Sequence, residues 1–370
     1  MVQTAAPKMK PTVEWGFYIV VAVIFLFIFP QVLSAFQISL LGKFLTYAIV
    51  ALGLDLIWGY TGMLSLGQGL FFGLGAYCFG MYLNLEAAGT RLPEFMGLYG
   101  VFELPWFWKP FYSPVAAIVI AMLLPMLIAA ILGFMLFRSR IQGVYFSIIT
   151  QAFTAIIALL LVGQQQSING TNGITQITTI FGYTLAEPQT QLALYIVTFV
   201  VMAMVFLGLR RLVNSRFGRL LVAVRDDEDR VRFVGYNPVM LKTIAFVISA
   251  GISGLAGALF VPQVGIISPQ QLGIVASIEI VIWVAVGGRG TLVGAILGAI
   301  LVNGGKSTIS SVNPDLWQII MGALFVIVVL VMPKGILGAM ASAFNWRRFT
   351  TKAPVLEFKS DEIESVSAKG

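Results

Sequence analysis

Histidine is absent from this chain of 370 residues, and cysteine occurs only once, at Cys78. Imidazole acid–base catalysis, metal sites built from histidine and cysteine, and an internal disulfide are therefore excluded. Charge is also scarce, because Asp, Glu, Lys and Arg make up only 11% of the residues, whereas soluble proteins carry roughly a quarter. These absences argue against a soluble enzyme.

Apolar residues make up 58% of the chain, and the mean hydropathy is +0.92. A bilayer core of about 30 Å needs roughly 20 apolar residues of helix. The sequence contains ten apolar segments of about this length, of which the eighth and ninth are shorter. The sequence predicts an all-α polytopic membrane protein embedded in a lipid bilayer. Its predicted spans are residues 15–33, 40–58, 63–83, 114–137, 144–162, 192–212, 243–261, 272–286, 291–305 and 317–337.

Lysine and arginine are distributed unevenly between the two sides of these spans. Ten spans place both termini on one side, and 19 of the 23 Lys and Arg fall there. Because cytoplasmic loops are enriched in Lys and Arg, we expect both termini in the cytoplasm. The net charge of +7 belongs to this topology signal, so we expect no nucleic-acid partner. The four exceptions on the opposite side are Lys43, Arg91, Lys109 and Lys306.

The predicted organisation has one membrane domain with short flanking segments. Residues 1–14 form a cytoplasmic N-terminus, and residues 15–338 form the transmembrane domain, with a cytoplasmic loop at 213–241. The charged, serine-rich segment 339–370 is expected to be a disordered cytoplasmic tail. The first apolar stretch is too long for a cleavable signal peptide, so we expect a retained helix.

Glycines recur three or four residues apart in three of the spans. In membranes, small residues at this spacing let helix backbones approach closely, and close packing is the first interpretation. A second interpretation is that residues 59–69 and 287–290 interrupt helices and expose backbone groups to a polar pathway. The three clusters are Gly69 and Gly73, with Gly75 and Gly80 in the same span; Gly251, Gly254 and Gly257; and Gly290, Gly294 and Gly298.

Asp55 and Glu279 are the only acids that fall well inside the predicted spans. An Asp at the centre of a membrane helix costs about 2.5–3.5 kcal/mol on insertion scales, so such residues face a bundle interior or a water-filled cavity. Two interpretations stay open. The acids line a permeation route, or they only form hydrogen bonds between helices.

The cytoplasmic loop at 213–241 contains the most distinctive run of charge. Acids suit the start of a helix, glycine suits its end, and proline blocks its continuation, so we expect one short helix over 230–234. This helix is a candidate docking element for a separate motor; the alternative is a solvated charged loop. The candidate coupling residues are Arg225, Asp226, Asp227, Glu228, Asp229, Arg230, Gly235 and Pro238.

A motor is not evident in the chain itself. A phosphate-binding P-loop needs Gly-x4-Gly-Lys-Ser/Thr after a strand. Residues 304–308 imitate the end of this motif, but Ile300 stands where its first glycine belongs, and the surroundings are a predicted membrane helix. We therefore expect ATP and Mg to bind in other subunits, and no cofactor to bind this chain.

Several motifs together resemble the permease subunits of bacterial ABC importers for branched-chain amino acids and urea. They include ALGLDL at 51–56, GYTGMLSLGQG at 59–69, FFGLGAY at 71–77 and GGRGTL at 287–292. The others, at 217–219, 225–230, 245–250, 254–259 and 333–335, extend the resemblance over roughly residues 40–338. Residues 103–111 and 317–335 are most similar to the second permease of the urea importer.

The resemblance implies a multi-pass subunit of the bacterial plasma (inner) membrane. It implies a heterodimer with a homologous sister permease, two cytoplasmic ATPase subunits and an external solute-binding protein. It also implies that residues 225–238 contain the helix that inserts into an ATPase groove. The chain departs from the family at Gln68, where many relatives carry histidine, so no titrating role transfers to that position.

We therefore expect the permease subunit of an ATP-driven importer for a small polar solute, with urea favoured over branched-chain amino acids. The solute is expected to pass near Asp55, Ser65, Gln68 and Glu279. The alternative is a self-sufficient secondary transporter or channel in which Asp55 and Glu279 carry coupling protons. A membrane enzyme ranks third, because no nucleophile and base arrangement is recognisable.

Overall fold

The protein is described by a computed structural model that covers residues 22–89 and 91–331, together with residues 16, 18, 20, 335 and 336. The predicted N-terminal segment 1–14 and the tail 339–370 lie outside the described residues, as do parts of the first and last predicted spans. The helices and strands are η1 Ile24–Ile28, α2 Phe29–Val32, α3 Ala35–Thr61, α4 Gln68–Ala88, α5 Glu94–Leu98, η2 Trp106–Tyr112, α6 Pro114–Arg138, α7 Val144–Gly163, α8 Gln165–Ile168, β1 Thr179–Ile180, β2 Tyr183–Thr184, α9 Pro188–Asn214, α10 Arg216–Asp226, α11 Glu228–Phe233, α12 Pro238–Val264, η3 Pro269–Leu272, α13 Ile274–Gly287, α14 Leu292–Val312 and α15 Pro314–Val331.

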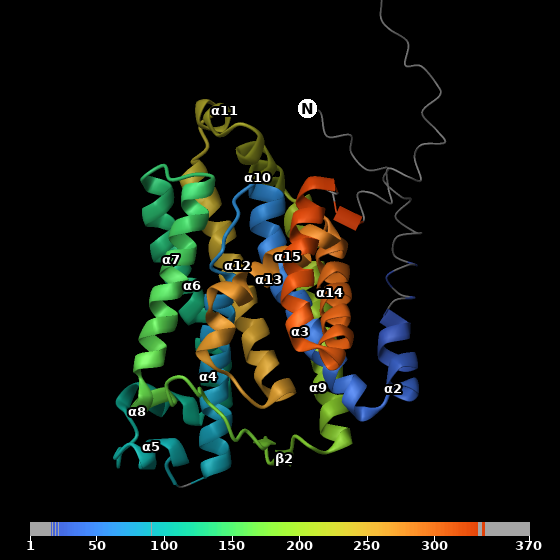
Figure 1. Cartoon of the computed structure of the whole chain (residues 1–370). Helices are drawn as coiled ribbons and strands as arrows, with labels where there is room; N and C mark the ends of the chain where they lie inside the picture. Colours follow the sequence, from blue (N-terminus) through green and yellow to red (C-terminus); the bar gives the residue numbers. More distant parts are fainter. Residues whose placement is uncertain are drawn as a thin grey trace, which may run out of the picture.

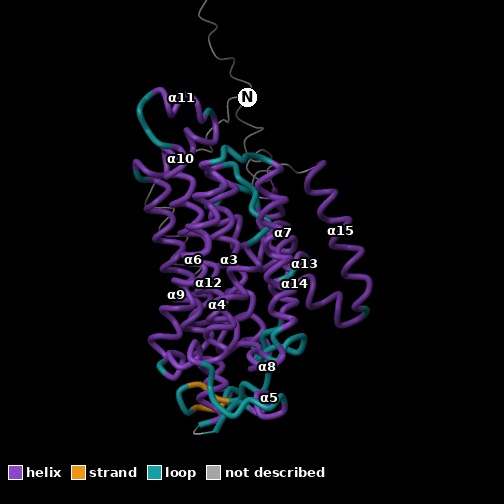
Figure 2. The backbone as a smooth tube through the Cα atoms, turned by 90° about the vertical axis from the view of Figure 1, so that its left-hand side faces the viewer, coloured by secondary structure: helices purple, strands orange, loops and turns teal. Residues whose placement is uncertain are grey.

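The long helices form one bundle and run between its two ends (Figure 1). Helices α10 and α11 lie at one end, and α5, α8 and the small hairpin of β1 and β2 lie at the other (Figures 1 and 2). Within the described residues, α3, α6, α7, α9, α12 and residues 292–311 of α14 are long and apolar enough to cross a membrane. These six helices confirm an all-α, multi-pass membrane protein.

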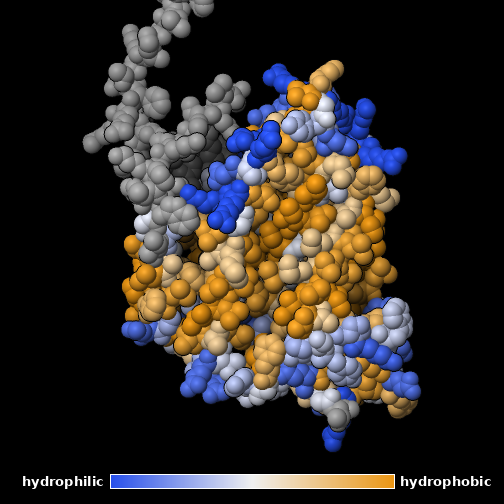
Figure 3. Space-filling view, turned by 180° about the vertical axis from the view of Figure 1, so that it is seen from behind, coloured by the Kyte–Doolittle hydropathy of each residue, from blue (hydrophilic) through white to orange (hydrophobic). Residues whose placement is uncertain are grey.

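Burial separates central helices from peripheral ones. In α3 and α12, 78% and 67% of the most apolar stretch is buried inside the protein, whereas the value is 22% in α6 and α7. The peripheral helices expose large apolar side chains such as Leu127, Leu159 and Met204. The side of the bundle is correspondingly apolar between two more hydrophilic ends (Figure 3), as a lipid-facing surface requires.

Capping residues explain why the helices extend beyond the predicted apolar stretches. Helix α3 begins five residues before the predicted span at residue 40, because Ser34 and Gln37 form a capping box. Helix α12 begins at Pro238, since Asn237 accepts hydrogen bonds from the next two free backbone N–H groups. Pro238 was expected to block continuation of the short helix before it, and that helix, α11, ends at Phe233. Pro238 itself occupies the first position of α12, where proline is favoured.

The glycine clusters pack helix backbones against one another, which confirms the first interpretation of their spacing. A Cβ atom on Gly75 of α4 would lie 2.6 Å from the Gly254 Cα of α12. A Cβ on Gly257 would lie 2.8 Å from the backbone nitrogen of Ala76. Helices α4 and α12 therefore touch at a distance that leaves no room for a side chain.

Replacing Gly257 with alanine is expected to destabilise the protein, because the added methyl group forces α4 and α12 apart. Overpacking of this kind costs about 1–3 kcal/mol. The matched control is Gly208→Ala in α9, where an added Cβ meets no atom within 4 Å. Thermal unfolding in detergent should show a lower midpoint for Gly257→Ala alone, and equal midpoints would contradict the close contact.

Candidate functional site

Residues 213–241 form two helices, which corrects the prediction of a loop with one short helix. Helix α10 begins after Ser215, whose hydroxyl accepts a hydrogen bond from the backbone N–H of Gly218. Its apolar side chains Leu221 and Val224 are buried, and the helix packs against α3, α9 and α12. An amphipathic helix is therefore seated on the end of the bundle (Figure 1).

Helix α11 begins at Glu228, two residues before the predicted start. Asp227 is its N-cap, and its carboxylate accepts a hydrogen bond from the backbone N–H of Arg230 at 3.0 Å. The predicted placement of acids at a helix N-terminus is thus confirmed, with Asp227 as the cap. Gly235 follows the helix with φ of +90°, a left-handed conformation that glycine adopts without strain.

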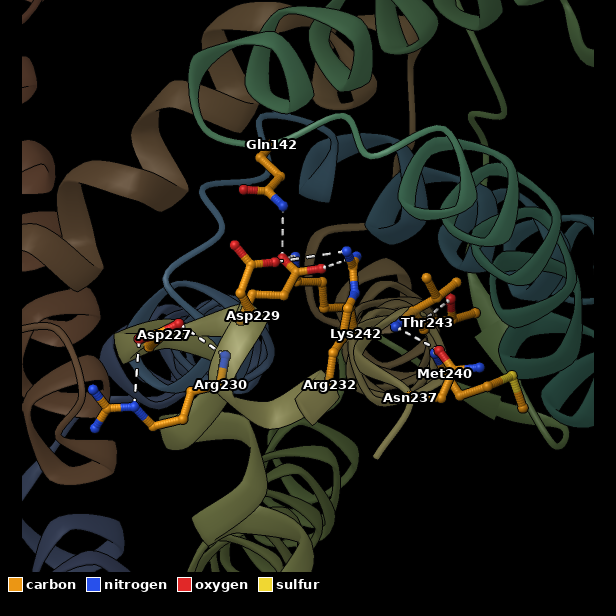
Figure 4. Close-up of polar contacts among 11 residues, drawn as sticks. Gln142, Asp227, Asp229, Arg230, Arg232, Asn237, Met240, Lys242 and Thr243 are labelled. Atoms are coloured by element: carbon orange, nitrogen blue, oxygen red, sulfur yellow. Dashed lines mark hydrogen bonds and ion pairs between the residues drawn. The ribbon is translucent and has the colours of Figure 1, made fainter. Parts of the chain in front are cut away.

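Glu228 is the centre of the polar contacts of α11. Its carboxylate accepts hydrogen bonds from the amide of Gln142 at 2.6 Å and from the guanidinium of Arg232 at 2.7 Å, and it also pairs with the ammonium of Lys242. The side chains of Glu228 and Lys242 are only 13% and 6% exposed. Figure 4 shows its three partners Gln142, Arg232 and Lys242, which come from the connection between α6 and α7, from α11 and from α12. Glu228 therefore attaches α11 to two other parts of the bundle.

The opposite face of α11 points away from the bundle. The side chains of Asp229 and Arg230 are both 82% exposed, and Phe233 and Val234 are 92% and 71% exposed. At this end of the molecule, apolar and hydrophilic side chains lie next to one another on the surface (Figure 3). Large apolar side chains exposed beside charges are typical of a surface that binds another protein.

Arg225 joins α10 to the end of α3. Its guanidinium donates a hydrogen bond at 2.9 Å to the carbonyl oxygen of Gly59, and a second at 3.1 Å to the neighbouring carboxylate of Asp226. The Gly59 carbonyl is among the last four of α3, which lack partners within their own helix. A cation is also favourable at a helix C-terminus.

Gly59 in turn touches the turn between α13 and α14. A Cβ on Gly59 would lie 2.5 Å from the Gly290 nitrogen and 2.6 Å from Oδ1 of Asp55. Oδ1 of Asp55 accepts a hydrogen bond from that nitrogen at 2.6 Å. Arg225, Gly59, Gly290 and Asp55 therefore form a continuous contact path from α10 into the bundle.

Both predicted interruptions are present in the described structure. The chain is not helical at residues 62–67, between α3 and α4, or at residues 288–291, between α13 and α14. In the first break, neighbouring side chains satisfy the backbone. Thr150 accepts from Leu66, Ser147 donates to Leu64, and Ser277 accepts from Gly69 at the start of α4. These three partners were missed, because the sequence does not show which helices surround a break.

Ser65 and Gln68 are fully buried, with no exposed surface. The Gln68 amide donates to Ser249 at 3.0 Å and accepts from Ser253 at 2.7 Å, and Ser65 accepts from the backbone of Gly67. Their hydrogen bonds are made within the protein, and neither residue lines the cavity that contains Glu279. Their place in a solute pathway stays a prediction.

Glu279 lines a cavity of about 690 Å³ together with Lys43 and Lys306. From the sequence, both lysines were counted on the side opposite the cytoplasm. In the structure they belong to α3 and α14. The ammonium of Lys306 contacts both carboxylate oxygens of Glu279, at 2.6 and 2.8 Å. Asp55, Ser65 and Gln68 do not line this cavity, so the structure separates Glu279 from the other three predicted pathway residues.

The lysine of the P-loop-like segment 304–308 is thus engaged by a carboxylate. The whole segment is part of α14, where the backbone N–H groups are used within the helix and cannot cradle phosphates. In the part of the chain that the structure describes, no three acidic or cysteine side chains gather into a metal-binding group.

Comparison with known proteins shows which protein family and which transport proteins the chain is similar to. Residues 36–329 match the family model described as branched-chain amino acid transport system / permease component. The chain is 28% identical over 350 residues to the high-affinity branched-chain amino acid transport system permease protein LivM of Escherichia coli (strain K12). This match covers 88% of this chain and 76% of LivM. It is also 27% identical over 309 residues to the high-affinity branched-chain amino acid transport system permease protein LivH of the same strain. This match covers 79% of this chain and 91% of LivH. A further relative is the probable branched-chain amino acid transport permease protein LivM of Methanocaldococcus jannaschii, which is 27% identical over 268 residues; the match covers 69% of this chain and 75% of that protein. No solved structure matches the chain.

Proposed function

This chain belongs to the branched-chain amino acid transport system permease family, and from that membership we propose that it is the membrane subunit of an ATP-driven importer for a small polar solute. It carries the solute pathway, while separate subunits hydrolyse ATP. The proposed complex contains a sister permease, two cytoplasmic ATPase subunits and an external solute-binding protein, in the bacterial inner membrane. ATP and Mg are bound by the ATPases.

The observation that carries the proposal is the pair of helices α10 and α11. They combine an anchored side, where Glu228 pairs with Lys242, with an exposed side that presents Phe233 and Val234. A motor protein that binds the exposed side can push on the bundle through the anchored side. Arg225 extends this connection to Gly59, next to one of the two breaks in the helices.

A cross-linking experiment tests the docking. Cys78 is the only cysteine and is buried, so Cys78→Ala gives a background without thiols in this chain. In that background, Phe233→Cys should form a cross-link to an ATPase subunit, whereas Gln189→Cys, at an exposed site at the start of α9, should form none. If Phe233→Cys cross-links to no ATPase in an actively transporting complex, the proposed docking is wrong.

For the solute, we propose urea ahead of branched-chain amino acids. The support is the resemblance of residues 103–111 and 317–335 to the second permease of the urea importer. The relatives named above are described as branched-chain amino acid permeases, so those amino acids are the alternative. The test is ATP hydrolysis by the purified complex with its binding protein. Stimulation by urea and not by leucine supports the proposal, and the reverse result rejects it.

The proposed topology has ten spans with both termini in the cytoplasm. It adds α4, α13, α15 and the segment 15–33 to the six long apolar helices. The helices α10 and α11 then lie in the cytoplasm, and η2 lies outside. The distribution of Lys and Arg supports this orientation.

Labelling of single cysteines is expected to report this topology. In the Cys78→Ala background, a thiol reagent that does not cross membranes should label Trp106→Cys in intact cells, because Trp106 is 80% exposed and the proposed position is outside. In the chain produced without the ATPase subunits, Phe233→Cys should be labelled only after the membrane is opened. The opposite pattern would invert the proposed orientation.

One observation favours the alternative of a self-sufficient secondary transporter. Asp55 is fully buried, and its Oδ2 atom has no hydrogen-bond partner among the described residues. A buried carboxyl group with one unpartnered oxygen is a candidate proton carrier. In the proposed importer this carboxylate instead holds the turn at Gly290, and transport does not depend on a proton gradient.

A further inference from the structure

The cavity that contains Glu279 lies between helices from both halves of the sequence. Its lining comes from α3, α4, α7, η3, α13 and α14, and its volume of about 690 Å³ is large enough for a small organic molecule. One part of the lining is apolar and aromatic, with Val50, Phe72 and Ile280. The other part contains the three charged side chains.

The charges of the cavity do not balance. Glu279 is paired with Lys306 at 2.6 Å, and their side chains are 15% and 38% exposed. Lys43 forms no ion pair within the residues that the structure describes; its ammonium lies 5.9 Å from the centre of the Tyr47 ring. A charged group inside a membrane helix is costly and usually marks a functional position. Because Glu279 and Lys306 already neutralise each other, Lys43 is not needed to balance the charge of Glu279. Its presence in the cavity is therefore not explained by ion pairing within the protein.

The aromatic wall gives the cavity a defined shape. Tyr47 lies against Trp283, with ring centres 4.7 Å apart, and it stacks on Phe260 at 5.6 Å. Phe72 packs edge-on against Phe260 at 5.1 Å. These mutual contacts hold the rings in place, so Tyr47 and Trp283 present a fixed surface beside the charged groups.

We propose that Lys43, Glu279 and Lys306 form the polar end of a solute subsite, an inference that rests on the transport function proposed above. The ligand carries N–H donors together with a carbonyl or carboxylate oxygen. Its oxygen accepts a hydrogen bond from Lys43, and its N–H groups donate to Glu279, whose carboxylate has room for more than one donor. The aromatic wall covers the rest of the ligand. Urea and a zwitterionic amino acid both have this chemistry.

Protection of a cysteine from alkylation tests the subsite directly. Ala276 lines the cavity one helical turn before Glu279, so the test variant is Ala276→Cys in the Cys78→Ala background, within the complete complex. Urea or leucine, each at a concentration that saturates uptake, should slow the alkylation of this cysteine severalfold. Gln189→Cys, outside the cavity, should react at the same rate with and without solute.

Comparing urea with leucine shows which of the two kinds of solute binds in the cavity. Protection by urea alone assigns a urea-type ligand, and protection by leucine alone assigns an amino acid; either result supports the subsite. If neither solute protects while ATP-driven uptake is normal, the subsite is wrong and the transport function stands. If both protection and ATP-driven uptake are absent, both proposals fail.

A charge variant shows whether Lys43 takes part in binding. Lys43→Met should raise the solute concentration for half-protection at least tenfold, and Lys43→Arg should restore it, because arginine retains the positive donor. Lys109→Met is the control for the loss of a lysine charge, since Lys109 is exposed and does not line the cavity. Unchanged protection in Lys43→Met would overturn the role of this lysine.

Discussion

Replacement of Glu228 with alanine is expected to abolish ATP-driven uptake and to release the ATPase subunits from the complex. Glu228 accepts hydrogen bonds from Gln142 and Arg232 and neutralises the buried Lys242. Removing one member of a buried ion pair costs about 3–5 kcal/mol, since the other charge stays buried without a partner. Helix α11 should therefore lose its fixed position on the bundle. Co-purification of the ATPases and uptake into vesicles measure the two losses.

Glu187→Ala is the control for the loss of a carboxylate. Glu187 is exposed, its side chain makes no capping hydrogen bond at the start of α9, and it lies outside the face of α11 that is proposed to bind the ATPase. Uptake and ATPase co-purification should therefore stay near the wild-type level. The exchanged pair Glu228→Lys with Lys242→Glu should recover part of the function. Wild-type uptake in Glu228→Ala would show that α11 does not need this anchor.

Replacement of Arg225 with alanine is expected to separate ATPase binding from transport. This side chain reaches the Gly59 carbonyl at 2.9 Å and lies outside the exposed face of α11 that we propose to bind the ATPase. Its loss interrupts the contact path to Gly290 and Asp55 while leaving the docking surface in place. ATPase co-purification should persist, and uptake should fall at least tenfold.

Arg219→Ala controls for the loss of a positive charge from the same helix, because Arg219 is exposed on α10. Its uptake should match the wild type. Two results would contradict the proposed path: normal uptake in Arg225→Ala, or loss of ATPase binding together with uptake. The first result would make the contact with Gly59 irrelevant to transport. The second would place Arg225 in the docking surface.

Local features of the chain were predictable from its residues. Acids before a short amphipathic stretch indicated the helix start that Asp227 caps. Glycine-rich stretches at 59–69 and 287–290 indicated the two breaks, since glycine favours turns and weakens helices. The apolar stretches located most long helices, although their ends shifted because polar capping residues such as Ser34 and Asn237 extend them.

Long-range pairing was not predictable in the same way. Gln142 and Glu228 are 86 residues apart, and Asp55 and Gly290 are 235 residues apart. Helix α10 was missed because its apolar positions form a buried face only once α3, α9 and α12 are in place. That Lys43 and Glu279 line one cavity was not predictable either, because it depends on how α3 packs against α13.

The most direct test of the proposed function is uptake into proteoliposomes with two preparations, the complete complex and this chain alone. The complete complex is expected to accumulate solute only when ATP and the binding protein are present, and a pH gradient should not replace ATP. This chain alone should accumulate nothing under either condition. Accumulation by the chain alone, driven by a pH gradient and lost in Asp55→Asn, would contradict a permease that is moved by separate ATPases.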